Sequence, residues 1–363
     1  MAPTRVGLIG LSKTGWAPIA HLPYLKATDK FEIVAIQNSS VESARDAIKL
    51  HGLPESTKAY GSPDDLANDP NVDLVVCSTR VDRHKECIVP SLKTGKDVYV
   101  EWPLGKSLAD AEEISSHKKQ GLAIVGLQGR QAPIIATVRD FIASGKLGDV
   151  ISSTWSGHGG MGGDVAQEEY AYFADKSVGG SLLTIHSGHA LDWIQKALGS
   201  AFDSTKTHAL LANRRPFVKL TKADGTVLSD KHPKTTDDTI LIHGVLSSSV
   251  PVQFTLHGGP AFKGTPSLDW RILGSKGELR VTASGVFLQI GYPDQKIEFF
   301  DSAADKVTEV PIQTDKWDEL LPQPAGNVAR VYELIAGDAE AKKSLCTFED
   351  AIERHRFLEG LES

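Results

Sequence analysis

The chain has 363 residues, enough for two domains that each bury a core of their own. A composition of 40% hydrophobic and 23% charged residues excludes disorder, and a formal charge of -7 argues against direct nucleic-acid binding. There is no apolar run near the roughly 20 residues of a membrane span. Cys77, Cys87 and Cys346 are scattered, so neither a disulfide framework nor a metal site is predicted, which is typical of a cytoplasmic protein.

Short β-branched runs alternate with helical patterns over the first third of the chain. Strands are expected at residues 5–10, 31–37, 72–79 and 97–103, and helices at 21–27, 41–52 and 82–95. Such alternation predicts a parallel sheet with helices on both faces. We assign residues 1–128 to an α/β domain of this doubly wound, Rossmann type.

The pattern changes from about residue 150. Strands at 150–159, 250–259, 268–283 and 286–292 and one clear helix at 189–199 predict an α+β domain with an open antiparallel sheet over residues 129–325. The glycine-rich segment 156–165 is interpreted as a mobile loop that covers a site. Helical patterns at 327–341 and 347–362 predict that residues 326–363 pack back near the first domain.

The segment 7–16, GLIGLSKTGW, follows the first strand and has the form of a phosphate-binding glycine loop. Ser12 replaces the middle glycine of GxGxxG, but its hydroxymethyl group is small and can donate a hydrogen bond to phosphate. Glycines also serve turn geometry alone, so the position after the first strand of an alternating unit is what favours a dinucleotide. The candidate contacts in this loop are Gly10, Ser12, Lys13, Thr14, Gly15 and Trp16.

The turn after the second strand bears on which dinucleotide is bound. No acid stands at residues 37–40, where a carboxylate would bind the adenosine ribose. A 2′-phosphate is therefore tolerated, with Lys13 or Arg80 as its counter-charge, and NADP is slightly favoured over NAD. The alternative is a solvated turn without a cofactor contact. The remaining candidate cofactor contacts are Asn38, Ser39, Ser40, Ser78, Thr79, Arg80, His84, Glu101, Trp102 and Gln128.

The chain resembles the Gfo/Idh/MocA oxidoreductases in the order and spacing of several stretches, namely RVGLIGLSKTGW, CSTRVDRHKECIVPSLKTGKDVYVEWPLGKSLADAEEI, GKLGDV, GGSLLTIHSGHALDWIQKALG and LGSKGEL. Within that family it is most similar to the fungal galactose-regulon repressor group, which shares GW, VEW, LQGR and GHxxD. The resemblance implies an NAD(P)-dependent enzyme acting on a sugar, polyol or related hydroxylated molecule. It also implies a homo-oligomer, a dimer or tetramer, paired through a sheet face that would otherwise expose an apolar patch.

The resemblance marks two departures at the implied active site. The family's Glu-Lys-Pro triplet, whose lysine lies beside the nicotinamide, is Glu101-Trp102-Pro103 here, and tryptophan stacks on rings but exchanges no protons at neutral pH. The family's aspartate four residues before a helix histidine is Ile185, so only His189 is kept. Histidine suits the uptake of a hydroxyl proton as hydride leaves, and the catalytic candidates are His189, Trp102 and Glu101.

Each candidate also has a purely structural interpretation. His189 can be a helix-packing histidine, and Glu101 can fix the turn before Pro103. His186, one helical turn before His189, is expected to be structural, as are Asp192 and Trp193. For Arg130 and Gln128, an ion pair buried under the hinge is weighed against a ligand contact. His84 is expected to shape the cofactor pocket, and Tyr170 and Tyr172 are alternative acids.

Two classes of function therefore stand. In the first, the protein is an oxidoreductase in which His189 carries the proton. In the second, it keeps the dinucleotide pocket without catalysis and acts as a cofactor-sensing, nucleo-cytoplasmic regulator with a protein partner. Loss of the lysine and the aspartate favours the regulator, while His189 and a chain without extended acidic or low-complexity segments favour the enzyme. A third alternative is NAD-assisted glycoside cleavage.

Overall fold

The computed structural model describes residues 2–362 and divides into two units. The first unit comprises the chain up to Gln128 together with Lys316–His355, and the second comprises Gly129–Asp315 with the residues from Arg356 onward. The return to the first unit thus begins ten residues before the expected position 326, and the last turns of the chain belong to the second unit. None of the helices within residues 2–362 is long and apolar enough to cross a membrane.

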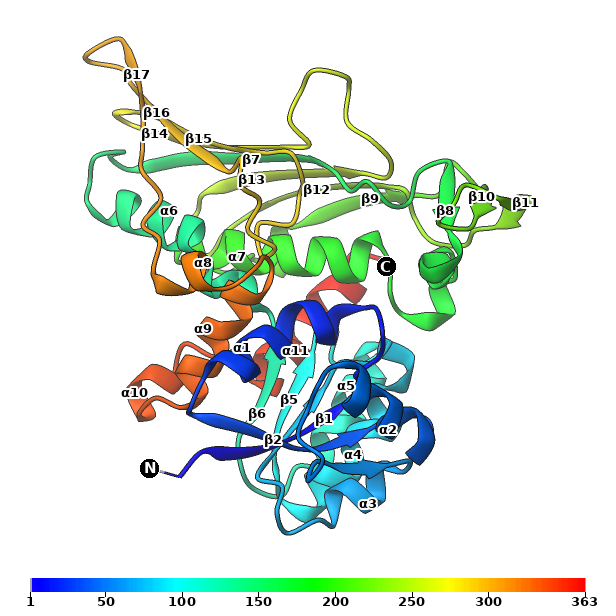
Figure 1. Cartoon of the computed structure of the whole chain (residues 1–363). Helices are drawn as coiled ribbons and strands as arrows, with labels where there is room; N and C mark the ends of the chain where they lie inside the picture. Colours follow the sequence, from blue (N-terminus) through cyan, green and yellow to red (C-terminus); the bar gives the residue numbers. More distant parts are fainter. Residues whose placement is uncertain (1, 363) are drawn as a thin grey trace. The chain divides into compact units, whose positions relative to one another are not determined.

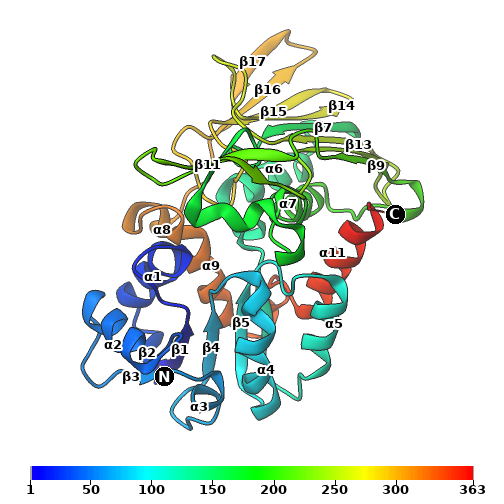
Figure 2. The same cartoon turned by 90° about the vertical axis from the view of Figure 1, so that its right-hand side faces the viewer.

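The first unit is built on a six-stranded parallel sheet of order β3-β2-β1-β4-β5-β6, which confirms the predicted α/β class; β6 is labelled in Figure 1 and the other strands in Figure 2. The strands are β1 Thr4–Ile9, β2 Phe31–Gln37, β3 Lys58–Tyr60, β4 Leu74–Cys77, β5 Asp97–Glu101 and β6 Ala123–Gly126. The strand order reverses between β1 and β4. In doubly wound sheets a ligand binds outside the carboxyl ends of the strands at this reversal.

Helices cover both faces of this sheet, with α3, α4 and α5 next to one another on one side and α1 and α9 on the other (Figures 1 and 2). A π-helical turn, Ala17–His21, leads into α1. The helices are α1 Leu22–Ala27, α2 Val41–Leu50, α3 Pro63–Ala67, α4 His84–Thr94, α5 Leu108–Ser116, α8 Lys316–Leu320, α9 Ala325–Ile335, α10 Ala339–Lys342 and α11 Phe348–Gly360.

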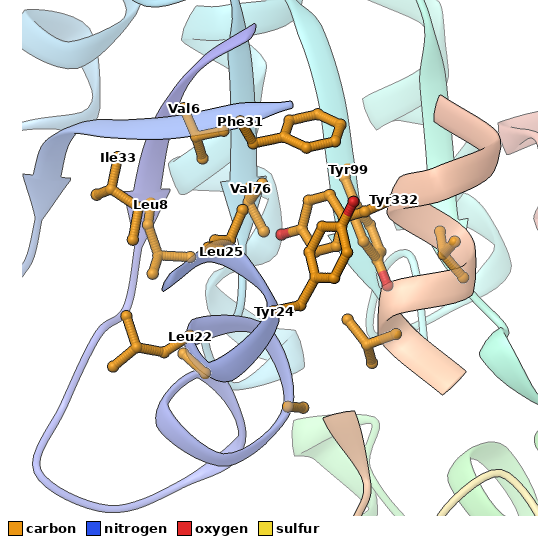
Figure 3. Close-up of a cluster of buried hydrophobic side chains, with 14 of the residues drawn as sticks. Val6, Leu8, Leu22, Tyr24, Leu25, Phe31, Ile33, Val76, Tyr99 and Tyr332 are labelled. Carbon is orange, nitrogen blue, oxygen red and sulfur yellow. The ribbon is translucent and has the colours of Figure 1, made fainter. Parts of the chain in front are cut away.

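Aromatic side chains join the C-terminal segment to the core of the first unit (Figure 3). The rings of Tyr24 in α1 and Tyr332 in α9 stack with their centroids 5.1 Å apart, and Tyr99 of β5 meets Tyr332 edge-on at 5.5 Å. All three side chains are fully buried. Aromatic contacts of this kind add to the stability that burial of their area supplies.

The second unit carries an eight-stranded sheet of order β17-β16-β15-β14-β7-β13-β12-β9 and a three-stranded sheet of order β11-β10-β8. The expected antiparallel pattern holds except between β7 and β13 in the larger sheet and between β8 and β10 in the smaller one, where the strands run parallel. The helices are α6 Pro133–Ala143 and α7 Gly188–Leu198. The strands are β7 Val150–His158, β8 Val165–Gln167, β9 His208–Ala212, β10 Phe217–Thr221, β11 Val227–Pro233, β12 Thr239–Val245, β13 Pro251–His257, β14 Leu268–Gly274, β15 Gly277–Ala283, β16 Lys296–Asp301 and β17 Lys306–Glu309.

One expectation for this unit is wrong, and two others lose part of their support. Residues 286–292 form turns instead of a strand, with the Ile290 N–H donating to the Phe287 carbonyl at 2.8 Å. The glycine-rich segment is shorter than expected, because β7 runs to His158, and it is anchored by a bond of 2.8 Å from the Gly159 N–H to the His257 carbonyl. The centre of the open sheet face is polar and carries Thr154, Ser156, Asp269, Arg271 and Arg280. An apolar patch is therefore no argument for pairing there, and the oligomeric state stays a prediction.

Candidate functional site

The loop after β1 has the backbone that a phosphate cradle needs. Gly10 and Gly15 have φ values of 91° and 107°, in the left-handed region that favours glycine. A Cβ on Gly10 would lie 2.7 Å from the carbonyl oxygen of Ser78, so the loop approaches the end of β4 at a distance that only glycine permits. Ser12 fits the loop, because its hydroxyl donates to the Thr14 carbonyl and the His51 ring nitrogen Nε2 donates to the Ser12 carbonyl at 2.8 Å.

Buried polar atoms at this edge of the sheet indicate a missing ligand. The Ser78 hydroxyl, the Trp16 indole N–H and the Gln128 side-chain oxygen are buried and have no hydrogen-bond partner within residues 2–362. Buried polar groups in folded proteins are nearly always paired, so these atoms call for partners from outside the chain. A dinucleotide has both donors and acceptors. The residues around the glycine loop therefore fit NAD or NADP.

Two residues of the turn after β2 serve the turn itself. The Asn38 side-chain amide donates to the carbonyls of Leu11 at 2.8 Å and of Ser43 at 3.1 Å, which ties the glycine loop to α2. The Ser40 hydroxyl accepts the Ser43 N–H at 3.1 Å and caps that helix. Ser39 and Ser40 are both exposed, and the Ser39 hydroxyl makes only a long contact of 3.5 Å with the Ser43 hydroxyl.

The two predicted counter-charges for a 2′-phosphate differ in their surroundings. Arg80 forms a two-pronged ion pair with Asp82, with bonds of 2.7 and 2.8 Å. Its guanidinium is thus already partly neutralised. Lys13 is exposed on the glycine loop, and it is the better candidate.

His84 joins the ends of two neighbouring strands. Its ring nitrogens lie 2.9 Å from the Pro103 carbonyl and 3.0 Å from the Thr79 carbonyl, and a neutral ring can donate to only one of them. Burial lowers the pKa of His84, in spite of the two carbonyls that raise it. The ring holds the segment after β5 against the end of β4, and its role in shaping a cofactor pocket stays a prediction.

The carboxylate of Glu101 is held inside the first unit. Its Oε1 accepts a hydrogen bond of 2.9 Å from His21, whose other ring nitrogen lies 2.9 Å from the Tyr332 hydroxyl. Trp102 is 5% exposed, and its ring lies 4.7 Å from that of His355. Sequence reasoning missed all three partners, because His21, Tyr332 and His355 are far from the motif in the chain and nothing in their own surroundings marks them. The catalytic assignments of Glu101 and Trp102 stay predictions.

The second unit places His186 and His189 on one continuous helical stretch. The π-helical turn Leu182–Ser187 begins at Ser181, which forms a capping box with Thr184, and leads directly into α7. His186 lies between aromatic rings, 5.4 Å from Phe173 and 4.3 Å from Phe287. Burial, and second the charge of a protonated His189, lowers the pKa of His186 to about 3. His186 is therefore a neutral neighbour of His189, not a substitute for the missing acid.

Asp192, one turn after His189, is paired with Arg130. The guanidinium donates to both carboxylate oxygens at 2.9 to 3.1 Å, and both side chains are nearly inaccessible, with 6% and 3% exposed. Of the two interpretations of Arg130, a buried ion pair or a ligand contact, the structure shows the ion pair. The pair fixes α7 to the segment that begins the second unit, and so helps to orient the helix that carries His189.

Stability is expected to fall as the pH drops below 6.5. His186 and His355 are held neutral in the folded state, with pKa values lowered by burial from 6.5 to about 3 and about 4. As the pH falls, the unfolded chain binds these protons at a higher pH than the folded chain does. The free energy of unfolding therefore decreases between pH 6.5 and the folded pKa values, by about 1.4 kcal/mol per pH unit for each group. Urea unfolding at several pH values checks this. His186→Leu should flatten the slope, whereas the exposed His208→Gln should leave it unchanged, and equal slopes in all three proteins would contradict it.

Comparisons with known proteins agree with this architecture. Residues 4–127 match the model of the oxidoreductase family with an NAD-binding Rossmann fold, and residues 133–283 match the Gal80p C-terminal domain. The dehydrogenase aclE of Aspergillus oryzae is 30% identical over 98% of this chain and 94% of its own length. The galactose/lactose metabolism regulatory protein GAL80 of Saccharomyces cerevisiae is 32% identical over 80% of this chain and 69% of its own length.

The solved structures include a close counterpart. A super-repressor mutant of Gal80p from Saccharomyces cerevisiae superposes with a TM-score of 0.88 at 27% identity, over 99% of this chain and 95% of that one. The fold and the glycine cradle define a protein of the NAD-binding oxidoreductase class. The chain belongs to the Gfo/Idh/MocA oxidoreductase family, close to its Gal80-like group.

Proposed function

We propose that the protein is an NAD(P)-dependent oxidoreductase that acts on a hydroxyl group of a sugar, polyol or related small molecule. The observation that carries this proposal is that α7 retains the histidine of the family, His189. It follows the neutral His186 on the same helical stretch and precedes Asp192, which is paired with Arg130. The similarity to a dehydrogenase, 30% identical over 94% of that enzyme's length, adds support.

In this proposal the bound cofactor supplies the hydride acceptor or donor, at C4 of its nicotinamide. Gly10, Ser78 and the amino-terminal end of the helical segment at Ala17 hold the pyrophosphate. The neutral His189 imidazole takes the proton of the substrate hydroxyl in oxidation and returns it in reduction.

A cofactor-binding regulator is the second candidate. Trp102 stands where the family has its lysine, and its ring is buried against His355. Ile185 replaces the aspartate, so two of the three groups implied by the family cannot transfer protons. In this alternative the chain binds NAD(P) and a protein partner without turnover.

The two candidates differ in one experiment. The protein, first shown by fluorescence titration to bind NADPH or NADH, is mixed with a panel of sugars, polyols and their keto forms while absorbance of the reduced nicotinamide is followed. Turnover of any member supports the oxidoreductase. Tight cofactor binding without turnover on the whole panel favours the regulator.

We further propose that NADP is preferred over NAD, and Ser39→Asp tests this. Ser39 is exposed after β2, and a carboxylate there repels a 2′-phosphate but accepts hydrogen bonds from ribose hydroxyls. Affinity for NADPH should fall about tenfold or more, which corresponds to about 1.4 kcal/mol, while affinity for NADH is kept or improved. The uncharged Ser39→Asn is the matched control. Equal losses of NADPH affinity in both variants would show that charge at this position plays no part.

A further inference from the structure

A cavity of about 540 Å³ lies in the second unit, where β7 and β13 end. His158 and His257 are the last residues of these two strands and lie opposite each other in the parallel ladder. Arg214 and Arg215 reach the cavity from the connection between β9 and β10, and Asp164 from the segment before β8. All of the lining residues belong to the second unit.

The one buried carboxylate of this cavity is already neutralised. Asp238 is fully buried, and its side chain lies 3.2 Å from the ammonium of Lys234, itself only 2% exposed. The same carboxylate accepts the backbone N–H groups of Arg214 at 3.0 Å and of Arg215 at 2.8 Å. Asp238 therefore fixes the backbone that presents both arginines, while Lys234 cancels its charge.

The remaining charges favour an anion. Arg215 forms an ion pair of 2.8 Å with Asp164, whose side chain is 85% exposed. For the Arg214 side chain, no ion-pair partner is found within residues 2–362. Arg215 also lies 3.9 Å from Asp238, so Arg214, Arg215 and Lys234 together supply three positive charges against the two carboxylates of Asp164 and Asp238. Guanidinium groups bind phosphate oxygens with paired hydrogen bonds, which makes arginine the usual residue for such sites.

His158 and His257 add ring N–H donors whose protonation depends on whether an anion is bound. Their ring centroids are 5.6 Å apart, so two protonated rings would repel each other. Burial, and second the charge of His257, lowers the pKa of His158. The charged groups that face this pair are Arg214, Arg215, Asp164 and the Asp238–Lys234 pair. A bound anion offsets the mutual repulsion and raises the pKa of His158.

We propose that this cavity binds a phosphate group, free or carried by a small molecule, through Arg214, Arg215, His158 and His257. The site is separate from the glycine loop, which lies in the other unit. Asp164, at the end of the glycine-rich segment, lines the cavity, and a Cβ on Gly159 of that segment would lie 3.5 Å from Nδ1 of His186. The occupied cavity thus adjoins a segment that touches the helical stretch carrying His189.

The test uses full-length protein saturated with NADPH, so that the glycine loop is occupied. Inorganic phosphate and glucose 6-phosphate are titrated in separate arms at constant ionic strength, and the ring C–H resonances of His158 and His257 are followed by NMR. His158→Gln and His257→Gln assign the two signals. Both signals should shift, and the titration midpoint of His158 should move to higher pH with the anion bound.

Arg214→Gln is the decisive variant, because it keeps the backbone N–H that binds Asp238. It should weaken binding about tenfold or more, whereas Lys222→Gln, an equal charge change at an exposed position outside the cavity, should not. Equal affinity for both probes identifies phosphate itself as the ligand, and tighter binding of the sugar phosphate identifies a phosphate-bearing molecule. No shift with either probe, or unchanged binding in Arg214→Gln, would overturn the proposal.

Discussion

Replacing His189 by alanine is expected to lower kcat about 100- to 10,000-fold, the range that a positioned general acid–base supplies. Because neither the glycine loop nor the turn after β2 involves His189, the affinity for NADPH should not change. The measurement is steady-state reduction of the cofactor, with affinity obtained separately from nicotinamide fluorescence. His189→Gln should lose activity to a similar degree, because an amide keeps the hydrogen bonds but takes up no proton.

The matched control is His208→Gln, an exposed histidine on β9 of the same unit, which should keep full activity. Full activity in His189→Ala would refute the assignment of His189 as the proton carrier. In that case Tyr172, one of the alternative acids, would be tested next.

Replacing Asp192 by asparagine is expected to lower the free energy of unfolding by about 3–5 kcal/mol, because it removes the carboxylate that pairs with the buried guanidinium of Arg130. Both side chains of this pair are almost inaccessible, and asparagine keeps the shape of aspartate, so the loss reports charge and not a cavity. Urea unfolding followed by circular dichroism measures the change.

The control for that variant is Asp269→Asn. Asp269 pairs with Arg280 at 2.7 Å, but the two side chains are 28% and 38% exposed, so the loss should be only about 0–1 kcal/mol. Equal losses in the two variants would show that burial of the Arg130–Asp192 pair has no energetic consequence.

The sequence predicts the fold of the first unit well because the signals there are local. The runs 31–37 and 41–52 became β2 and α2, since β-branched alternation and a helix-capping serine determine structure over a few residues. The predicted strand at 286–292 failed for a related reason. Val286 and Leu288 are buried in alternation, as in a strand, but local turns and not a neighbouring strand place them in the core.

The site was harder to predict, because the role of a polar side chain depends on its hydrogen-bond and ion-pair partners in the folded chain. Arg80 was expected to meet a phosphate, yet its partner Asp82 lies two residues away and is visible in the sequence. The link between Glu101 and His21 spans 80 residues, and no pattern in the sequence points to it. The glycine cradle was predictable, since a left-handed backbone beside a crowded strand end leaves glycine as the fitting residue.

The most direct test of the central claim is transfer of deuterium from the cofactor. Reduced NADP carrying deuterium at C4 of the nicotinamide is incubated with the protein and the keto forms of the sugar and polyol panel, and the products are analysed by mass spectrometry. The proposed oxidoreductase yields a product one mass unit heavier, at a carbon that bears a hydroxyl, and His189→Ala abolishes this gain. Tight binding of the cofactor with no deuterium in any product would contradict the claim and favour a regulator.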